Sequence, residues 1–114
     1  MNFNEEQVIS EISSIFSPIN QINPRVVIGI GDDAAVIETD QHSVITTDMA
    51  IEDVHFKREW SSAYEIGSKV TVANLADVYA MGADPQYLVV GLTLTGNEKM
   101  EWIKELARGI ADTA

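Results

Sequence analysis

Three aspartates and two threonines in this chain stand where side-chain oxygens could hold a hard cation. Asp33 ends a Gly-Asp-Asp turn, Thr46, Thr47 and Asp48 follow one another at the end of a β-branched run, and Asp77 lies in the stretch NLADVYAMG. Magnesium takes oxygen ligands and is usually held by one or two carboxylates together with phosphates and water. The pattern therefore predicts a magnesium–phosphate site assembled from separate parts of the chain.

Asp77 carries the most physical weight among these acids. It follows Ala73, Val70 and Ile66 by four, seven and eleven residues, which places it within an apolar stripe of a predicted helix. Asn74 precedes it by three residues and lies beside it on that helix. Because burying an unpaired carboxylate costs several kcal/mol, an acid in this stripe requires a cation, hydrogen-bond donors or water.

Each of these residues, considered alone, could also have an ordinary structural role. Asp side chains commonly bond to the backbone of their own turn, and they commonly cap helices. The alternatives are an Asx turn for Asp32 and Asp33, a cap on residues 49–52 for Asp48, an ion pair with Lys69 or Arg25 for Asp77, and a packed or exposed loop position for His55.

Composition excludes several classes of function. The 114 residues include 18 acids and 7 bases, a formal net charge of −11, which argues against a nucleic-acid partner. The absence of cysteine excludes disulfides and thiolate metal sites. No apolar run approaches the ~18 residues of a transmembrane helix, and the first residues do not resemble a secretory signal. We therefore expect a cytoplasmic protein with no membrane partner.

Hydrophobic periodicity and turn residues predict seven elements in the order α-β-β-β-α-β-α. That order indicates an α+β domain with one mixed sheet of about four strands and helices on one face. The predicted helices are Asn4–Phe16, stopped by Pro18, then Ser62–Met81 and a third from about Asn97; the predicted strands are Arg25–Ile30, Ala34–Glu38, Ser43–Asp48 and Gln86–Thr95, with a loop at Met49–Trp60.

Local signals refine these expectations. Asn4 is a predicted N-cap, Ser62 with Glu65 and Thr95 with Glu98 are predicted capping boxes, and Gly82 is a predicted helix stop. The helix Ser62–Met81 is apolar on all sides, which predicts that it is buried. The polar turn after residue 38 predicts a hairpin between the second and third strands. An apolar edge strand such as Gln86–Thr95 invites pairing with another subunit, so we expect a homodimer.

Three motifs carry a resemblance to a known family. They are GIGDDAAV at Gly29–Val36, TTDMAIEDVHF at Thr46–Phe56 and KVTVANLADVYAMGADP at Lys69–Pro85. In this order and spacing they resemble the N-terminal part of thiamine-monophosphate kinases, which belong to the aminoimidazole ribonucleotide synthetase-like superfamily. The resemblance runs from about residue 25 to 95.

The resemblance implies ATP-dependent phosphorylation of thiamine monophosphate to thiamine diphosphate, with several Mg²⁺ ions bridging phosphates. It implies that residues 1–114 form an N-terminal metal- and ATP-binding domain, without the C-terminal domain, and that such domains pair their sheets across a dimer. By motif, the implied metal ligands are Asp33, Thr46, Thr47, Asp48 and Asp77, with His55 contacting the thiamine phosphate and with Asp32 and Asn74 ranked below these.

Two rival readings remain open at this point. The chain could be another ATP-using member of the superfamily, in purine or selenophosphate synthesis, although no cysteine is present for selenophosphate chemistry. It could also be a non-catalytic dimerisation module. The presence of Asp33, Asp48 and Asp77 argues against a degenerate site.

Overall fold

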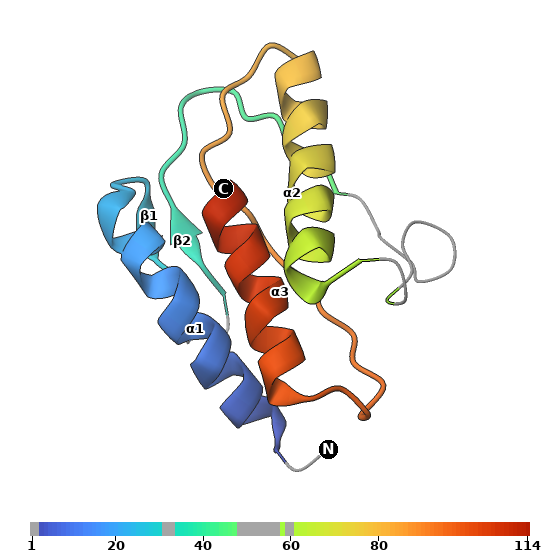
Figure 1. Cartoon of the computed structure of the whole chain (residues 1–114). Helices are drawn as coiled ribbons and strands as arrows, with labels where there is room; N and C mark the ends of the chain where they lie inside the picture. Colours follow the sequence, from blue (N-terminus) through green and yellow to red (C-terminus); the bar gives the residue numbers. More distant parts are fainter. Residues whose placement is uncertain (1–2, 31–33, 48–57, 59–60) are drawn as a thin grey trace. The chain divides into compact units, whose positions relative to one another are not determined.

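The computed structural model describes residues 3–30, 34–47, 58 and 61–114. The chain divides into two compact units, each described separately below: Met1–Ser43 with Gln86–Lys104, and Val44–Pro85 with Glu105–Ala114. The elements are α1 (Glu5–Ile22), β1 (Val26–Ile28), β2 (Val36–Ile37), α2 (Ala63–Ala80) and α3 (Met100–Thr113) (Figure 1).

Helix α1 begins as the sequence predicts. The Gln7 backbone N–H donates to the Asn4 side chain at 2.9 Å, and the Asn4 backbone N–H donates to the Gln7 side chain at 2.8 Å. This reciprocal capping box satisfies two backbone donors that the helix cannot pair internally. Glu5 and Glu6 lie in the first turn, where the helix dipole favours negative charge.

The predicted end of this helix is wrong. Instead of stopping at Phe16, α1 continues through Pro18 to Ile22. Proline inside a helix costs about 3 kcal/mol, because it removes one N–H donor and crowds the preceding turn. It does not remove the bonds on either side, and Ile19 and Ile22 continue the helical spacing of the apolar residues before it. The spacing of the apolar residues therefore predicts the end of α1 better than the position of the proline does.

Strands β1 and β2 form a two-stranded antiparallel ladder. Val26 lies opposite Ile37 and Ile28 opposite Val36, with an irregularity between the two pairs. Both strands fall within predicted strands, but their pairing differs from the prediction. The second strand pairs with the strand before it and not with Ser43–Asp48, so the predicted hairpin is wrong.

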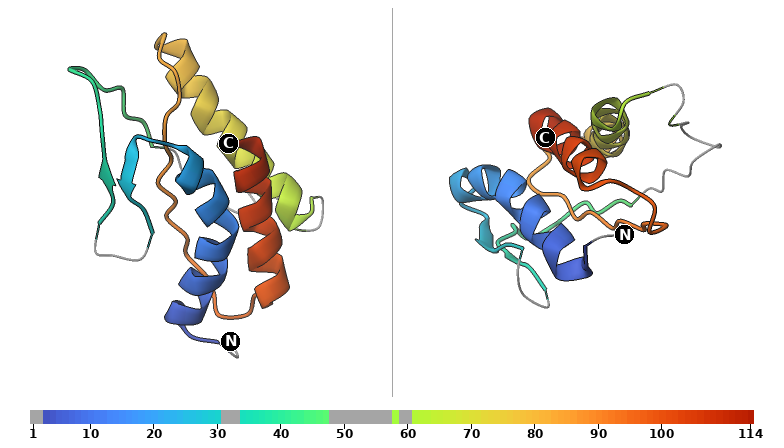
Figure 2. Two further views of the ribbon diagram at one scale, coloured as in Figure 1. Left: turned by 90° about the vertical axis from the view of Figure 1, so that its left-hand side faces the viewer. Right: turned by 60° about the horizontal axis from the view of Figure 1, so that its bottom comes forward.

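The predicted four-stranded sheet is not confirmed. In the described residues the sheet has two strands, and both residues 43–47 and residues 86–95 lack a ladder (Figure 2). The residue types of these two segments favour an extended backbone. A strand, however, also requires a partner strand for its N–H and C=O groups. Several apolar side chains of these segments are exposed, including Ile45 at 78% and Val89 at 89%.

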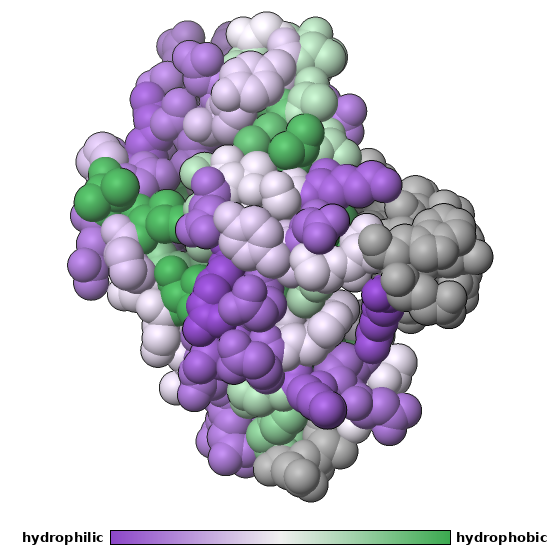
Figure 3. Space-filling model, in the orientation of Figure 1, coloured by the Kyte–Doolittle hydropathy of each residue, from purple (hydrophilic) through white to green (hydrophobic). Residues whose placement is uncertain are grey.

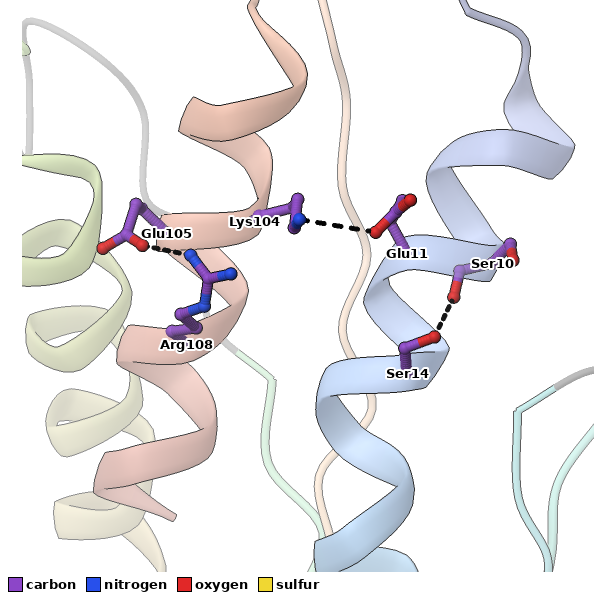
Figure 4. A network of polar contacts seen from close by, with 6 residues as sticks. All are labelled: Ser10, Glu11, Ser14, Lys104, Glu105 and Arg108. Carbon is purple, nitrogen blue, oxygen red and sulfur yellow. Dashed lines mark hydrogen bonds and ion pairs between the residues drawn. The ribbon is translucent and has the colours of Figure 1, made fainter.

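Polar contacts tie the first unit together at two places. Lys104 of α3 and Glu11 of α1 form an ion pair at 3.7 Å, and within α1 the Ser14 hydroxyl donates to the Ser10 carbonyl (Figure 4). The Asn23 side-chain amide donates to the Gln86 carbonyl. Val8 and Ile103 are the buried apolar side chains of this unit among the described residues.

The predicted capping box between Thr95 and Glu98 forms only in its Glu98 side-chain half, and it precedes the helix. The buried Glu98 carboxylate accepts from the Thr95 backbone N–H at 3.0 Å, the Thr95 hydroxyl at 2.8 Å and the Gly96 N–H at 3.1 Å. Gly96 has a φ of 98°, which suits a residue without Cβ. These hydrogen bonds close a turn before the helix. Helix α3 itself begins at Met100, three residues later than predicted.

Helix α2 agrees with its predicted bounds to within one residue. The Ser62 hydroxyl accepts from the Glu65 backbone N–H at 3.2 Å, as an N-cap does. At the other end, Gly82 has a φ of 75° directly after the Met81 C-cap. None of the helices in the described residues is long and apolar enough to cross a bilayer.

The second unit depends on a close crossing of α2 and α3 at two glycines. A Cβ on Gly67 would lie within 3.0 Å of the Leu106 carbonyl oxygen, and a Cβ on Gly109 would lie within 3.0 Å of the Tyr64 carbonyl oxygen. Around the crossing, α3 also carries an ion pair between Glu105 and Arg108 (Figure 4). Among the described residues of this unit the buried side chains are Ala63, Ile66, Thr71, Ala107 and Ala111.

Burial of α2 stops halfway along the helix. All of its buried residues lie between Ala63 and Thr71, whereas Val72 is 54% exposed and Tyr79 is 61% exposed. The prediction that the whole helix is buried is therefore wrong for its second half in this chain. The reason is that α3 covers α2 only near the crossing, and α2 extends past the C-terminal end of α3 (Figures 1 and 2).

Two side-chain hydrogen bonds join α2 and α3 next to the crossing. The Tyr64 hydroxyl donates to Asp112 at 2.9 Å, and the Thr113 hydroxyl bonds to the Ser68 hydroxyl at 2.8 Å. The hydrogen bond to the Asp112 carboxylate raises the pKa of Tyr64 above its ordinary value, because it favours the protonated phenol. Sequence periodicity gave no signal for these contacts.

We predict that Gly67→Ala destabilises the chain by about 1–3 kcal/mol, because the added methyl group must displace the α3 backbone. Gly91→Ala is the matched control, since nothing lies within 4 Å of a Cβ at that position. Urea unfolding followed by circular dichroism measures both. Equal stability of the two variants would contradict the close crossing.

We also predict that the Tyr64 phenol titrates above its ordinary range until Asp112→Asn removes the carboxylate. A folded-state pKa above the unfolded one gives stability that is present below the unfolded pKa and is lost as the pH rises through the folded pKa. Absorbance titration at alkaline pH, compared between wild type, Asp112→Asn and Tyr64→Phe, measures the shift. An unchanged titration in Asp112→Asn would refute the contact.

Candidate functional site

Four of the eight predicted site residues belong to the described part of the chain. Thr46 and Thr47 lie in an extended segment, and Asn74 and Asp77 lie on the second half of α2. All four belong to the same compact unit. The other four, Asp32, Asp33, Asp48 and His55, lie outside the described residues, as does most of the predicted loop Met49–Trp60.

Asp77 is exposed, which corrects the prediction that it lies buried in an apolar stripe. The stripe exists in the sequence, but α3, the other described helix of this unit, does not cover the half of α2 that carries Asp77. Among the described residues of its own unit, Asp77 does not form the ion pair with Lys69 that was one structural alternative. Arg25 belongs to the other unit, where it pairs with Asp40 at 3.4 Å.

Asn74 lies one turn before Asp77 and is half-buried. Its side-chain nitrogen donates to the Val70 carbonyl at 2.9 Å, four residues back along α2. A similar bond runs from the Thr71 hydroxyl to the Gly67 carbonyl at 2.8 Å. Side chains that bond to their own helix in this way are restrained in orientation, so Asn74 presents a defined group beside Asp77.

The donor chemistry at these positions fits a hard cation. Thr46 and Thr47 are exposed and supply hydroxyl oxygens, Asn74 an amide oxygen and Asp77 a carboxylate. Magnesium and calcium take these oxygen ligands. The described residues contain no cluster of three or more histidines or acids that could hold a metal by themselves, so a complete site requires further ligands.

One shallow depression lies elsewhere, in the first unit. It is lined by the first turns of α1 and the start of α3, with Glu6 and Glu11 among its polar side chains. It is widely open to solvent and contains none of the predicted site residues. Its surroundings are acidic, which disfavours phosphate binding in the absence of a cation.

Comparison with known proteins supplies the family. The AIR synthase related protein, N-terminal domain, matches residues 31–114. The chain is 36% identical over 108 residues to the thiamine-monophosphate kinase of Bacillus subtilis, covering 87% of this chain and 33% of that protein. It is 40% identical over 93 residues to the thiamine-monophosphate kinase of Methanocaldococcus jannaschii, covering 79% and 29%.

A third relative is the thiamine-monophosphate kinase of Rhodopirellula baltica, 39% identical over 100 residues, with 80% of this chain and 32% of that protein covered. The chain thus spans about a third of the length of these curated relatives. A search of solved structures finds no significant match. Because the family match covers most of the chain, the chain belongs to the AIR synthase related protein family, as its N-terminal domain.

Proposed function

We propose that this chain is the metal- and nucleotide-binding N-terminal domain of a thiamine-monophosphate kinase, which transfers a phosphoryl group from ATP to thiamine monophosphate. The observation that carries this proposal is the similarity to curated proteins of that name over most of the chain. The Gly-Asp-Asp, TTD and NLAD motifs are all present in the sequence. The catalytic unit is the whole enzyme, in which a C-terminal domain completes the site.

We assign the metal ligands to the three motifs. Asp33, Thr46, Thr47, Asp48 and Asp77 hold Mg²⁺, and Asp32 plays a lesser part. Magnesium bound there screens the phosphate charges and orients the groups for in-line transfer. The chain's own residues bind and position; none acts as a strong base. His55 contacts the phosphate of thiamine monophosphate.

The exposure of Asp77 supports this assignment in an unexpected way. A buried acid would have required a cation, hydrogen-bond donors or water for the fold itself, whereas an exposed acid without a partner in the described residues is free to bind a cation from solution. A site of exposed oxygens suits a metal that arrives with a nucleotide and retains several waters. An overall charge of −11 also favours cations over free phosphates.

We further propose that a second copy of the chain completes the sheet, with residues 43–47 and 86–95 becoming strands. Large apolar side chains of the first unit are exposed, among them Val27, Ile28, Val36, Val89 and Val90. Apolar groups also gather over the end of α1 and the two-stranded sheet on the face seen in Figure 3. Unpaired extended segments with apolar side chains are templates for pairing between chains.

The cytoplasm is the compartment we propose, since ATP is the co-substrate. The rival readings are a purine or selenophosphate enzyme of the same superfamily and a dimerisation module without chemistry. The named relatives favour the thiamine enzyme over the first rival. The metal titration below separates the proposal from the second.

We expect Mg²⁺ to bind this chain more tightly in the presence of ATP, and Asp77→Asn to weaken that binding roughly 10-fold or more, because it removes a charged ligand. Asp84→Asn is the matched control, another exposed acid of the same unit. Calorimetry measures both, with and without thiamine monophosphate. Equal affinities of Asp77→Asn and Asp84→Asn would refute the assignment, and a folded dimer that binds no metal would support the module without chemistry.

We expect the chain to sediment as a dimer and Val89→Lys to raise the dimer dissociation constant by at least about 10-fold, because a buried charge without a partner is unfavourable. Gln41→Lys adds the same charge at an exposed turn and serves as the control. Analytical ultracentrifugation over a concentration series measures both variants. A monomeric wild-type chain would contradict the proposed pairing.

A further inference from the structure

We propose that the outward face of α2 is a surface on which a second copy of this chain docks, with the two α2 helices packed antiparallel about Ala76. This surface goes beyond the function proposed above and does not rest on it. It is also separate from residues 43–47 and 86–95, which are proposed to complete the sheet. Three features of the face carry the inference: its exposure, the sizes of its side chains and the charges at its two ends.

The outward face of α2 lies opposite the contact with α3 (Figures 1 and 2). At 3.6 residues per turn, its second half consists of Val72, Ala73, Ala76, Tyr79 and Ala80. All five are exposed, Val72 at 54% and Tyr79 at 61%. The residues on the other side of the helix are buried or half-buried, namely Gly67, Thr71 and Asn74. A contiguous exposed apolar surface of this kind is typical of a site of interaction between proteins.

The sizes of these side chains fit an antiparallel copy of the same face. In a pair related by a two-fold axis through Ala76, Val72 of one helix lies opposite Ala80 of the other, and Tyr79 lies opposite Ala73. Each large side chain therefore meets a small one, which is the arrangement that lets two facing surfaces interdigitate. A parallel pair would instead place Val72 and Tyr79 opposite their own copies and hold the two backbones apart.

The charges at the two ends of the face also fit an antiparallel pair. Lys69 lies one turn before Ala73, Asp84 follows the end of α2, and both are exposed. With Ala76 on the axis, Lys69 of one copy lies opposite residue 83 of the other, next to Asp84. Opposite charges therefore meet at both ends, whereas a parallel pair would bring like charges together. Complementary charges of this kind set the register of two surfaces more than they add affinity.

Docking on this surface is compatible with the other proposals. Asp77 lies about 100° around the helix from Ala76, so pairing and metal binding use different sides of α2. The crossing with α3 is unaffected, because Gly67 lies on the opposite side of the helix from Ala76. Five side chains, three of them alanines, bury a small area, which implies a weak association. It therefore joins the dimers proposed above only at high protein concentration.

The test uses the absence of cysteine, which lets one introduced thiol report on one position of the 114-residue chain. Packed helix axes lie about 8–10 Å apart and Cα atoms about 2.3 Å from each axis. Two Ala76 Cα atoms on the two-fold axis are then about 4–5 Å apart, within reach of a disulfide. Glu65 is the matched control, since it is exposed on the same side of α2 but lies about 33 Å from its copy in the antiparallel pair.

We expect Ala76→Cys to form a disulfide-linked dimer at least about 10-fold faster than Glu65→Cys with oxidised glutathione, because paired helices raise the effective concentration of the two thiols. Non-reducing electrophoresis at high protein concentration measures both rates, and circular dichroism confirms that both variants are folded. Equal rates at the two positions would overturn the inference. A faster rate for Glu65→Cys would indicate a parallel pair and would overturn it as well.

Charge exchange tests the register within the Ala76→Cys background. We expect Lys69→Glu to slow disulfide formation about threefold, as loss of an exposed ion pair does. We expect Asp84→Lys, added to Lys69→Glu, to restore the rate, because opposite charges again face each other. A double variant that stays slow would overturn the antiparallel arrangement.

The same disulfide separates this surface from the earlier proposals. We expect Val89→Lys, which disrupts the proposed sheet pairing, to leave the rate of Ala76→Cys unchanged. Loss of the disulfide in that variant would show that pairing of the sheet brings the two thiols together, and it would overturn the separate surface. A failed metal titration would refute the proposed function and leave this result standing.

Discussion

The close crossing of α2 and α3 is the constraint on which the second unit depends. Gly67 and Gly109 each face the backbone of the other helix at a distance that a side chain would not allow. Small residues at a crossing let backbones approach and bring nearby side chains within reach, as in the bond between Tyr64 and Asp112. The burial of Ala63, Ile66, Ala107 and Ala111 follows from this approach, and these residues are small or moderate in size.

The position of the crossing along α2 also determines which residues of this helix remain exposed. Because α3 meets the first half of α2, it leaves the half with the NLAD motif uncovered by the described helices of this unit. The packed residues and the proposed metal ligands therefore lie on successive turns of the same helix. A substitution near Gly67 acts on stability, whereas one at Asp77 leaves the buried residues untouched. This separation explains why a helix that reads as apolar on all sides carries an exposed carboxylate.

Most local signals in the sequence predicted the structure correctly, with Pro18 as the exception, and the prediction of long-range pairing was wrong. The caps at Asn4 and Ser62 and the stop at Gly82 were correct because each depends on a side chain and its own few neighbours. The partner of β2 was wrong because pairing depends on residues distant in sequence. Pro18 was given too much weight as a stop, since a helix can retain its remaining bonds around one proline.

Predictions about the candidate site divide in the same way into local and long-range ones. Residue types were enough to predict oxygen ligands for magnesium, since the chemistry belongs to each side chain, and this stays a prediction. Whether Asp33, Asp48 and Asp77 converge is a long-range question, and Asp33 and Asp48 lie outside the described residues. The predicted burial of Asp77 was wrong because periodicity indicates which residues share a face and not what covers that face.

The exposure of Asp77 changes the physical reason for expecting a metal ion there. A buried acid implies a cation through the free energy of desolvation, and that reason no longer applies to Asp77. What remains is an exposed carboxylate beside an amide whose orientation is set by the Val70 carbonyl. The amide, already held by its own helix, loses little conformational freedom on binding, and the exposed carboxylate requires no change in the core. A cation that must arrive and leave with a nucleotide in each turnover is better served by these exposed, oriented oxygens than by a buried charge.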